Sequence, residues 1–273
     1  AEKIGVARVI SYGNRADVNE ADCLEFLAHD EHTKAVVLYI ESVEDGRRFV
    51  EAAALCASKK PVLAVKVGKG EAGVLAARSH TGAIAGRYEV YRAAFKKAGV
   101  IELSGYEEFI GACRVFGGIT PFGAAQGLTP PAGNRVMIIT DGGGMGVGIA
   151  DECASAGLNP APLSEELVDK LKGIFPSYFT ISNPLDLTGS ATDVLYAEAL
   201  TKTMNGDAFD IAIVAALWGP PGLTDALVKR ISNAAREINK PVIVCSPGGG
   251  FARKKSALFT KAGIAVFPTP ESS

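Results

Sequence analysis

The chain has 273 residues, and at roughly 150 residues per domain this length predicts about two domains. Charged residues make up 21% and apolar residues 48% of the chain, which is too apolar a composition for a disordered protein. The net charge of −2, without any block of like charge, gives no electrostatic basis for binding nucleic acid or a membrane surface.

The sequence contains no run of 18 apolar residues and no signal-peptide pattern at its start. Its 5 cysteines never form a C-x-x-C pair, so we expect a cytoplasmic protein with reduced thiols. The 3 histidines have no cysteine at ligand spacing, and His29 and His32 are interpreted as solvated residues at a helix end. No metal site is therefore predicted.

Short apolar runs rich in branched residues alternate with stretches of helical period along the chain. This β-α-β-α order predicts an α/β protein with parallel sheets covered by helices. In the first part, strands are expected at 7–13, 35–41, 61–67 and 99–103, and helices at 21–29, 45–58 and 87–98. In the second part, strands are expected at 135–140, 211–217, 241–246 and 264–268, and helices at 148–156, 191–204 and 224–238.

A stretch rich in Gly and Pro, 116–134, shows neither period and predicts a domain boundary. We place a first domain at 1–120, a linker at 121–133 and a second domain at 134–273.

The two halves also look like copies of one another. The segments 60–65 and 97–100 of the first half recur as 240–244 and 261–264 in the second, and the first copy is longer by about 16 residues. Aligning the copies assigns the extra residues to Gly70–Ala85, a segment that contains His80. Ligands of open α/β sheets bind outside the carboxyl ends of strands, where this enlarged loop belongs, so the loop is expected to be functional.

His80 and Glu41 are the candidate catalytic pair. A neutral imidazole can take up a phosphoryl group when a carboxylate orients its second ring nitrogen. Glu41 ends a predicted strand at the sheet edge to which the His80 loop belongs. The alternative interpretations are that His80 is a surface histidine or a hydrogen-bonded core histidine, and that Glu41 is a solvated glutamate. Lys66, Lys69 and Arg78 either offset phosphate charge or are ordinary surface cations.

The glycine-rich stretch 141–148 follows a predicted strand and opens a predicted helix, a context in which backbone N–H groups bind anions. Either it cradles phosphate or its glycines merely permit a tight turn. The dinucleotide-binding fingerprint is not met because the third glycine is out of register, and no P-loop motif occurs. The hydroxyls of 183–192 cap the following helix or meet an anion, and capping is favoured.

The stretches 9–49, 69–86, 140–148 and 182–192 resemble the NDP-forming acyl-CoA synthetases, in the ADP-forming acetyl-CoA synthetase branch of the succinyl-CoA synthetase superfamily. The resemblance extends over nearly the whole chain, and SHTGAIAG followed by NPLDLTG is its most specific part. It implies two consecutive flavodoxin-like, doubly wound domains with mainly parallel sheets, corresponding to the ligase domains of the family's alpha part.

The resemblance also implies roles for individual residues. His80 would be the phosphorylated histidine and Glu41 the glutamate that orients it. The residues expected to bind phosphate are Ser79, Thr81 and Gly82 in the loop, and Gly143, Gly144 and Gly146 in the glycine turn; Thr188 and Gly189 are weaker candidates.

The family reaction converts acyl-CoA, phosphate and ADP into acid, CoA and ATP through an acyl phosphate. It needs no permanent cofactor, and CoA, ADP or ATP, and Mg are expected at a CoA-binding domain and an ATP-grasp domain or subunit. Neither domain is recognisable here, so we expect a piece of a longer polypeptide that works in an oligomer with these partners. The rival interpretations are a noncatalytic module that senses acyl-CoA or phosphate in a regulatory protein, and a dinucleotide-binding dehydrogenase domain. The acyl group, the choice of ADP or GDP and the physiological direction stay open.

Overall fold

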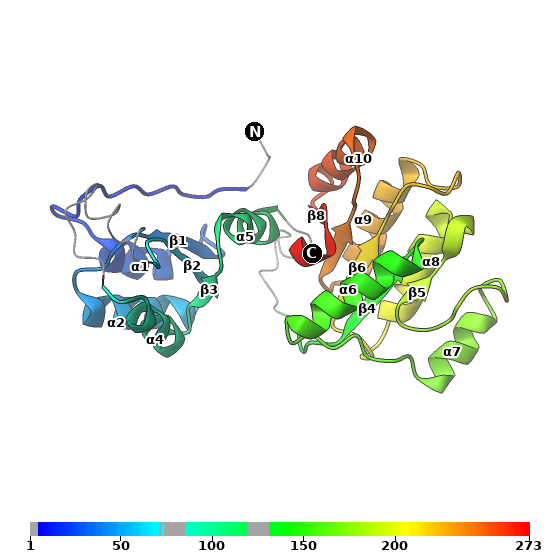
Figure 1. The fold of residues 1–273 in the computed structure, drawn as a ribbon, viewed down its shortest axis with the longest axis horizontal. Coiled ribbons are helices and arrows are strands. Elements are labelled where there is room, and N and C mark those ends of the chain that lie inside the picture. Colours follow the sequence, from blue (N-terminus) through cyan, green and yellow to red (C-terminus); the bar gives the residue numbers. More distant parts are fainter. Residues whose placement is uncertain (1–4, 71–72, 74–85, 119–130) are drawn as a thin grey trace. The chain divides into compact units, whose positions relative to one another are not determined.

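The computed structural model describes residues 5–70, 73, 86–118 and 131–273. They form two compact units, an N-terminal unit that ends at Gly117 and a C-terminal unit that begins at Gly118 (Figure 1). Most of the predicted linker, 121–133, lies outside the described residues. The predicted domain limits therefore remain a proposal.

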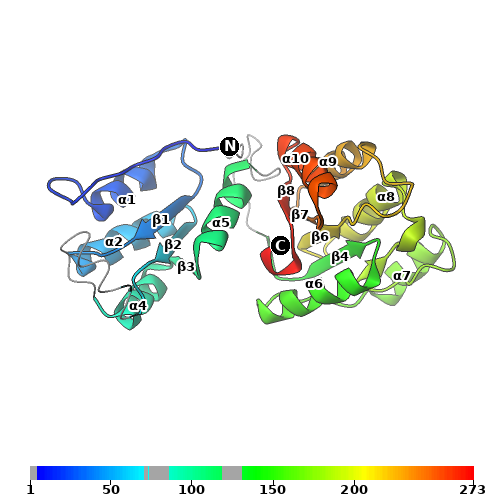
Figure 2. The same ribbon diagram turned by 45° about the horizontal axis from the view of Figure 1, so that its top comes forward.

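The described part of the N-terminal unit contains a parallel sheet of 3 strands in the order β1-β2-β3. Helices α1, α2 and α4 cover one face of this sheet and α5 covers the other (Figure 2). The bounds are α1 Glu20–His29, β1 Val36–Ile40, α2 Gly46–Ala57, β2 Val62–Lys66, α4 Tyr88–Ala98, β3 Ile101–Leu103 and α5 Tyr106–Gly118.

Local signals explain where these helices begin and end. Asn19 and Asp22 form a capping box at the start of α1, and Asp45 caps α2 by accepting from the backbone N–H of Arg48 at 3.0 Å. Helix α4 ends at Gly99, whose φ of 70° lies in the left-handed region that glycine adopts without a steric penalty. The predicted helices 21–29, 45–58 and 87–98 are thus confirmed within two residues at each end.

The strand expected at 7–13 is wrong, because residues 5–12 have no regular secondary structure and almost all are exposed. This segment is held by an ion pair between Arg8 Nε and Asp30 Oδ2 at 2.7 Å. Its branched residues have strand propensity, but a strand exists only when a neighbour satisfies its N–H and C=O groups. Among the described residues, no ladder pairs this segment with β1.

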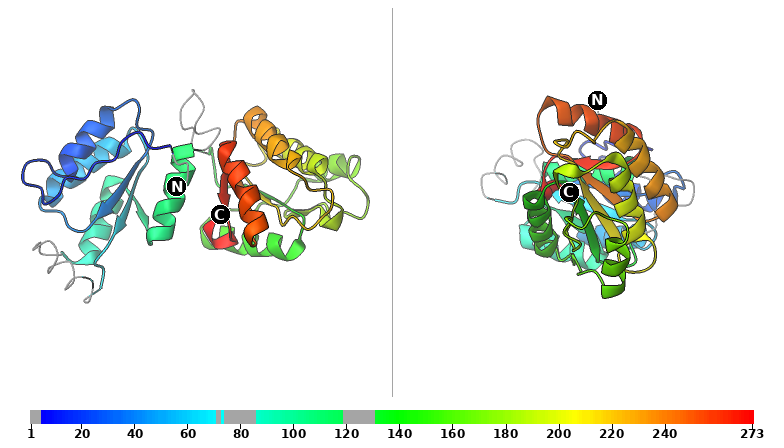
Figure 3. Two further views of the ribbon diagram at one scale, coloured as in Figure 1. Left: turned by 90° about the horizontal axis from the view of Figure 1, so that it is seen from above. Right: turned by 90° about the vertical axis from the view of Figure 1, so that its right-hand side faces the viewer.

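The described part of the C-terminal unit contains a parallel sheet of 5 strands in the order β5-β4-β6-β7-β8. Helices α7 to α10 pack on one face and α6 packs on the other, as the right-hand view of Figure 3 shows for α6 and α9. The bounds are β4 Val136–Thr140, α6 Gly143–Ser155, α7 Glu165–Lys172, β5 Leu185–Asp186, α8 Asp193–Met204, β6 Ile211–Ala215, α9 Ala226–Ile238, β7 Val242–Cys245, α10 Gly250–Lys261 and β8 Ala265–Phe267, with short 3₁₀ turns at Thr188–Ser190 and Pro270–Ser272.

The expected α/β class with parallel sheets is confirmed, and the two copies occupy equivalent strand-helix-strand units. In the first copy β2 leads through α4 to β3, and in the second β7 leads through α10 to β8. Helices α5, α7 and α10 and the short strand β5 are not predicted from the sequence, and α6 starts five residues before its predicted start. Glycines obscured α6 and α10, because glycine is a poor helix former that tertiary packing can nevertheless hold in a helix.

All 5 cysteines are free, and Cys113 alone is not fully buried. Among the described residues, none of the helices has both the length and the apolar character that a membrane span requires.

Candidate functional site

Glu41 lies at the carboxyl edge of the N-terminal sheet, directly after β1. The end of β2 lies next to it. Ile40, the last residue of β1, is paired with Lys66, and the N–H of Val67 donates to Ile40 O at 3.0 Å. Glu41 is half-buried. The segment that contains His80 leaves the sheet from the same strand β2, three residues after Val67.

Lys66 is a buried cation beside Glu41, not a surface cation. Its side chain is 1% exposed, and its Nζ donates to the backbone carbonyl of Glu41 at 2.8 Å and to that of Val67. The Nζ also lies 4.7 Å from the centre of the Tyr91 ring. Burial lowers the pKa of Lys66, and the nearby Glu41 carboxylate opposes that shift.

A second cluster joins both ends of the segment that contains His80. Glu102 in β3 accepts from the hydroxyl of Tyr88, which follows the segment, and lies 3.7 Å from Nζ of Lys69, which precedes it. Lys69 also donates to Ser104 O at 3.1 Å, and Arg92 lies 3.6 Å from Glu102. The hydrogen bond to Glu102 raises the pKa of Tyr88. No pattern in the sequence points to Glu102, Tyr88 and Tyr91, because their roles come from contacts between residues far apart in the chain.

The loop candidates Arg78, Ser79, His80, Thr81 and Gly82 lie outside the described residues. The structure therefore describes Glu41 and the sheet edge beside it, but not the predicted histidine.

In the C-terminal unit, the glycine-rich stretch forms the first turn of α6 at the carboxyl end of β4. Gly142 is the N-cap, and the N–H groups of Met145 and Gly146 donate back to its carbonyl at 3.0 and 3.2 Å. Gly143 and Gly144 are exposed, and within the described residues their N–H groups have no hydrogen-bond partner. Unpaired N–H groups and the positive end of the helix dipole favour an anion at this position.

The segment 183–190 packs directly against this turn. The Asn183 amide accepts from Ile138 N at 3.0 Å and donates to Val136 O at 2.7 Å, so it attaches the segment to β4. A Cβ at Gly146 would lie 3.0 Å from side-chain atoms of Pro184 and Thr140, and a Cβ at Gly143 would lie 2.9 Å from Asp186 Oδ2. Two motifs far apart in the sequence thus form one corner, in which glycine permits the close approach.

The hydroxyl of Thr192 acts as a cap, as favoured by the sequence: it accepts from Leu195 N at 3.2 Å at the N-cap of α8. The Thr188 hydroxyl accepts from Ser190 N at 3.3 Å, and the backbone N–H of Thr188, whose φ is 57°, donates to Asp186 Oδ1 at 2.8 Å.

Asp141, which precedes the N-cap of α6, is a buried carboxyl that the sequence analysis did not single out. Its Oδ1 accepts from the Tyr196 hydroxyl at 2.9 Å and from Leu217 N at 3.0 Å, whereas its buried Oδ2 has no partner among the described residues. Burial raises the pKa of Asp141, and burial together with this carboxyl raises the pKa of Tyr196.

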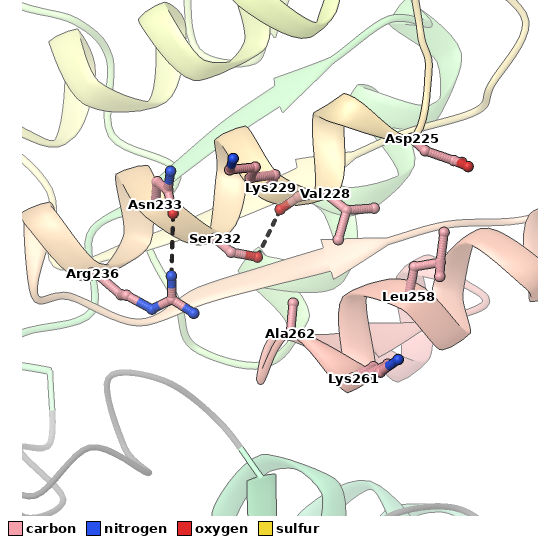
Figure 4. A pocket seen from close by; sticks show the side chains of 9 residues that line it. All are labelled: Asp225, Val228, Lys229, Ser232, Asn233, Arg236, Leu258, Lys261 and Ala262. Atoms are coloured by element: carbon pink, nitrogen blue, oxygen red, sulfur yellow. Dashed lines mark hydrogen bonds between the residues drawn. The ribbon is translucent and has the colours of Figure 1, made fainter.

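The remaining candidate positions show no cluster of metal-binding side chains among the described residues. His29 and His32 are exposed, and no group of 3 or more His, Cys, Asp or Glu among the described residues could hold a metal ion. A groove of about 470 Å³ between α9 and α10 has Asp225, Lys229, Arg236 and Lys261 among the residues that line it (Figure 4), and it contains none of the predicted site residues.

Two family comparisons divide the chain as its two units do. Residues 1–116 match the family described as succinyl-CoA ligase like flavodoxin domain, and residues 136–272 match the family described as Ligase-CoA domain.

Curated relatives and solved structures give the same result. The chain is 39% identical over 276 residues to the alpha subunit of acetate–CoA ligase (ADP-forming) II of Pyrococcus furiosus, covering 99% of this chain and 58% of that subunit. It is 36% identical to an ADP-forming acetate–CoA ligase of Methanocaldococcus jannaschii, covering 98% of this chain and 37% of the relative. A dinucleotide-forming acetyl-coenzyme A synthetase 1 of Ca. Korarchaeum cryptofilum, solved with phosphate and ADP, superposes with a TM-score of 0.86 at 30% identity, over 96% of this chain and 56% of that one.

The chain thus spans little more than half the length of the alpha subunits it matches. Both domain families, the curated relatives and the solved structure agree with the resemblance found in the sequence. The chain belongs to the ADP-forming acetyl-CoA synthetase family, as an alpha-subunit-like region in which a succinyl-CoA ligase-like flavodoxin domain is followed by a Ligase-CoA domain.

Proposed function

We propose that this chain is the phosphohistidine-bearing module of an ADP-forming acyl-CoA synthetase, with His80 as the phosphoryl carrier and Glu41 as the residue that orients it. The observation that supports this most is the position of Glu41. It directly follows β1 at the carboxyl edge of the sheet, beside β2, the strand that precedes the His80 segment. A carboxylate at this position can fix one imidazole nitrogen and leave the other free as a nucleophile.

In the proposed reaction, phosphate attacks the acyl carbon of acyl-CoA and releases CoA as the thiol, which forms an acyl phosphate. A ring nitrogen of His80 then attacks phosphorus, and the P–O bond to the acyl carboxylate breaks, so that free acid leaves. The phosphoryl group next passes from His80 to a terminal oxygen of ADP, which gives ATP and regenerates the neutral imidazole. Every step is reversible.

The start of α6 is the proposed phosphate-binding element of the C-terminal unit. Its support is the pair of N–H groups on Gly143 and Gly144, which have no partner in the described part of the chain and lie at a helix end that favours negative charge. Ser79, Thr81 and Gly82 remain proposed phosphate ligands on the basis of the family resemblance alone.

The partners of this module are also proposals. The solved relative contains phosphate and ADP, and the curated relatives are longer than this chain. We expect CoA and the nucleotide, with its Mg, to bind to a CoA-binding domain and an ATP-grasp domain or subunit that act together with this module.

Radiolabelling of the complete synthetase that contains this chain tests the proposal. Incubation with Mg and ATP labelled in the γ-phosphate should give an acid-labile, base-stable label on the chain. The label should disappear in His80→Ala and persist in His32→Ala, which removes an exposed histidine of the same unit. A label that survives in His80→Ala, or a wild-type chain that takes up none, would exclude the phosphocarrier role. Acyl-CoA or phosphate binding without any label would instead support the regulatory module.

A further inference from the structure

The turn that contains Glu41 is held at three consecutive residues by side chains from three distant parts of the chain. The residues held are Glu41, Ser42 and Val43, and the residues that hold them are Lys66 at the end of β2, Arg15 in the segment before α1, and Tyr91 in α4.

Each contact is made to the backbone, so it fixes the path of the turn. Lys66 Nζ donates to Glu41 O at 2.8 Å, Arg15 donates to Ser42 O at 2.9 Å, and Val43 N donates to the Tyr91 hydroxyl at 3.1 Å. The Glu41 side chain lies at the start of this fixed turn.

Arg15 is itself held in place by several groups. Its guanidinium donates also to Ser42 Oγ at 2.6 Å and forms ion pairs with Glu20 at 3.2 Å and Glu44 at 3.7 Å. The side chain is 11% exposed, and the backbone φ of 59° is a left-handed conformation that a non-glycine residue rarely adopts. Such backbone strain persists only where surrounding contacts over-determine it, and it is concentrated at functional sites.

Tyr91 and Lys66 also lie close to residues on either side of the segment that contains His80. Lys66 donates to the carbonyl of Val67 before the segment, and the Tyr91 ring would lie 3.3 Å from a Cβ at Gly86 after it. The same two side chains touch each other, since Lys66 Nζ lies 4.7 Å from the centre of the Tyr91 ring.

We propose that Arg15, Lys66 and Tyr91 are positioning residues that hold the Glu41 turn in the geometry required to orient His80. This inference rests on the proposed function, because it assigns a purpose to Glu41. A carboxylate that must orient an imidazole is effective only within a narrow range of positions, and a displacement of about 1 Å can slow a reaction by about a hundredfold.

Tyr91→Phe gives the sharpest test because it removes one hydroxyl and keeps the ring. The ring contacts to Lys66 and to Phe95, whose centroid lies 6.3 Å away, are retained, while the hydrogen bond to Val43 N is lost. In the complete synthetase, we expect rapid-quench labelling of His80 from γ-labelled ATP to slow by about tenfold. Tyr39→Phe is the matched control, since Tyr39 lies on β1, is 51% exposed and should label at the wild-type rate.

A double-mutant cycle separates positioning from general support of the fold. If Tyr91 acts through Glu41, Tyr91→Phe added to Glu41→Gln should change the labelling rate by less than about twofold. Arg15→Lys keeps the positive charge but loses the guanidinium that donates to Ser42 O and Ser42 Oγ. It should slow labelling only when Glu41 is present, and it tests the inference even if Tyr91→Phe fails to fold.

The outcomes distinguish this inference from the proposed function. The positioning role would be overturned if Tyr91→Phe and Arg15→Lys label at the wild-type rate. It would also be overturned if these changes slow labelling equally in the presence and in the absence of Glu41. In both cases His80 would remain the carrier. A wild-type synthetase without label on His80 would overturn the proposed function and the positioning role with it.

Discussion

At the scale of single residues, Glu41 and Asp141 are carboxyl groups in opposite environments. Glu41 is half-buried at the edge of one sheet, with a buried lysine beside it. Asp141 is 9% exposed, accepts two hydrogen bonds through one oxygen and leaves the other oxygen without a partner among the described residues. Burial favours the protonated form of this carboxyl, and the pKa of Asp141 is raised for that reason.

We expect Glu41→Gln to slow phosphorylation of His80 by about 10- to 100-fold, because glutamine keeps the shape but not the charge that favours the reacting imidazole. Its backbone contact to Lys66 does not involve the carboxylate, so the fold should be kept, but the loss of the charge that offsets the burial of Lys66 should lower the temperature of unfolding modestly. Rapid-quench labelling and circular dichroism measure the two effects. Labelling at the wild-type rate would remove Glu41 from the mechanism.

Asp141→Asn should change how stability depends on pH. The pKa of Asp141 in the folded state lies above its ordinary value of 3.8. The protonated carboxyl therefore contributes its full stabilisation of the folded state at pH values below 3.8, and this stabilisation is lost as the pH rises through the raised pKa. The free energy of unfolding of Asp141→Asn, relative to wild type, should therefore increase between acidic and neutral pH. Denaturant titrations of both proteins at several pH values measure it, and a constant difference would show that Asp141 ionises normally.

At the scale of elements, the glycines in the first turn of α6 differ in whether the packing around them requires glycine. Gly146 is buried, and an added Cβ would lie 3.0 Å from atoms of both Pro184 and Thr140. Gly144 is exposed, and an added Cβ would meet nothing within 4 Å. The spacing of glycines in the sequence does not distinguish these positions, because the difference comes from the segment 183–186 packed across the helix.

Gly146→Ala should lower the free energy of unfolding by about 1–3 kcal/mol, because the helix must move away from Pro184 or Thr140 to make room. Gly144→Ala is the matched control in the same turn, and it should leave stability unchanged or raise it by up to about 1 kcal/mol, since alanine is the better helix former. Urea titrations of both variants measure the difference. Equal losses in the two variants would contradict the packing argument.

At the scale of the whole molecule, each unit has apolar cores of its own. Two clusters of buried residues are built from the N-terminal unit and two from the C-terminal unit. The chain has one tryptophan, Trp218, which packs against the core of the C-terminal unit, so its fluorescence reports on that unit. Far-ultraviolet circular dichroism reports on both.

Phe95→Ala should therefore destabilise one unit selectively. Phe95 is 1% exposed, with the Phe49 and Tyr91 rings 6.1 and 6.3 Å away, and its truncation should cost the N-terminal unit about 3–5 kcal/mol. We expect an earlier transition by circular dichroism and an unchanged transition by Trp218 fluorescence. Equal shifts by both probes would show that the two units unfold as one.

The sequence by itself determined the fold class, most helices and strands, and the family, because apolar periodicity, capping residues and contiguous motifs are local patterns. It named Glu41 and the glycine turn as candidates from their order along the chain. Only the tertiary structure decided that residues 5–12 form no strand, that Lys66 is buried, that Pro184 packs on Gly146, and that Arg15, Lys66 and Tyr91 meet at the Glu41 turn. These features depend on contacts between residues distant in sequence, and such contacts exist only once the strands and helices have packed.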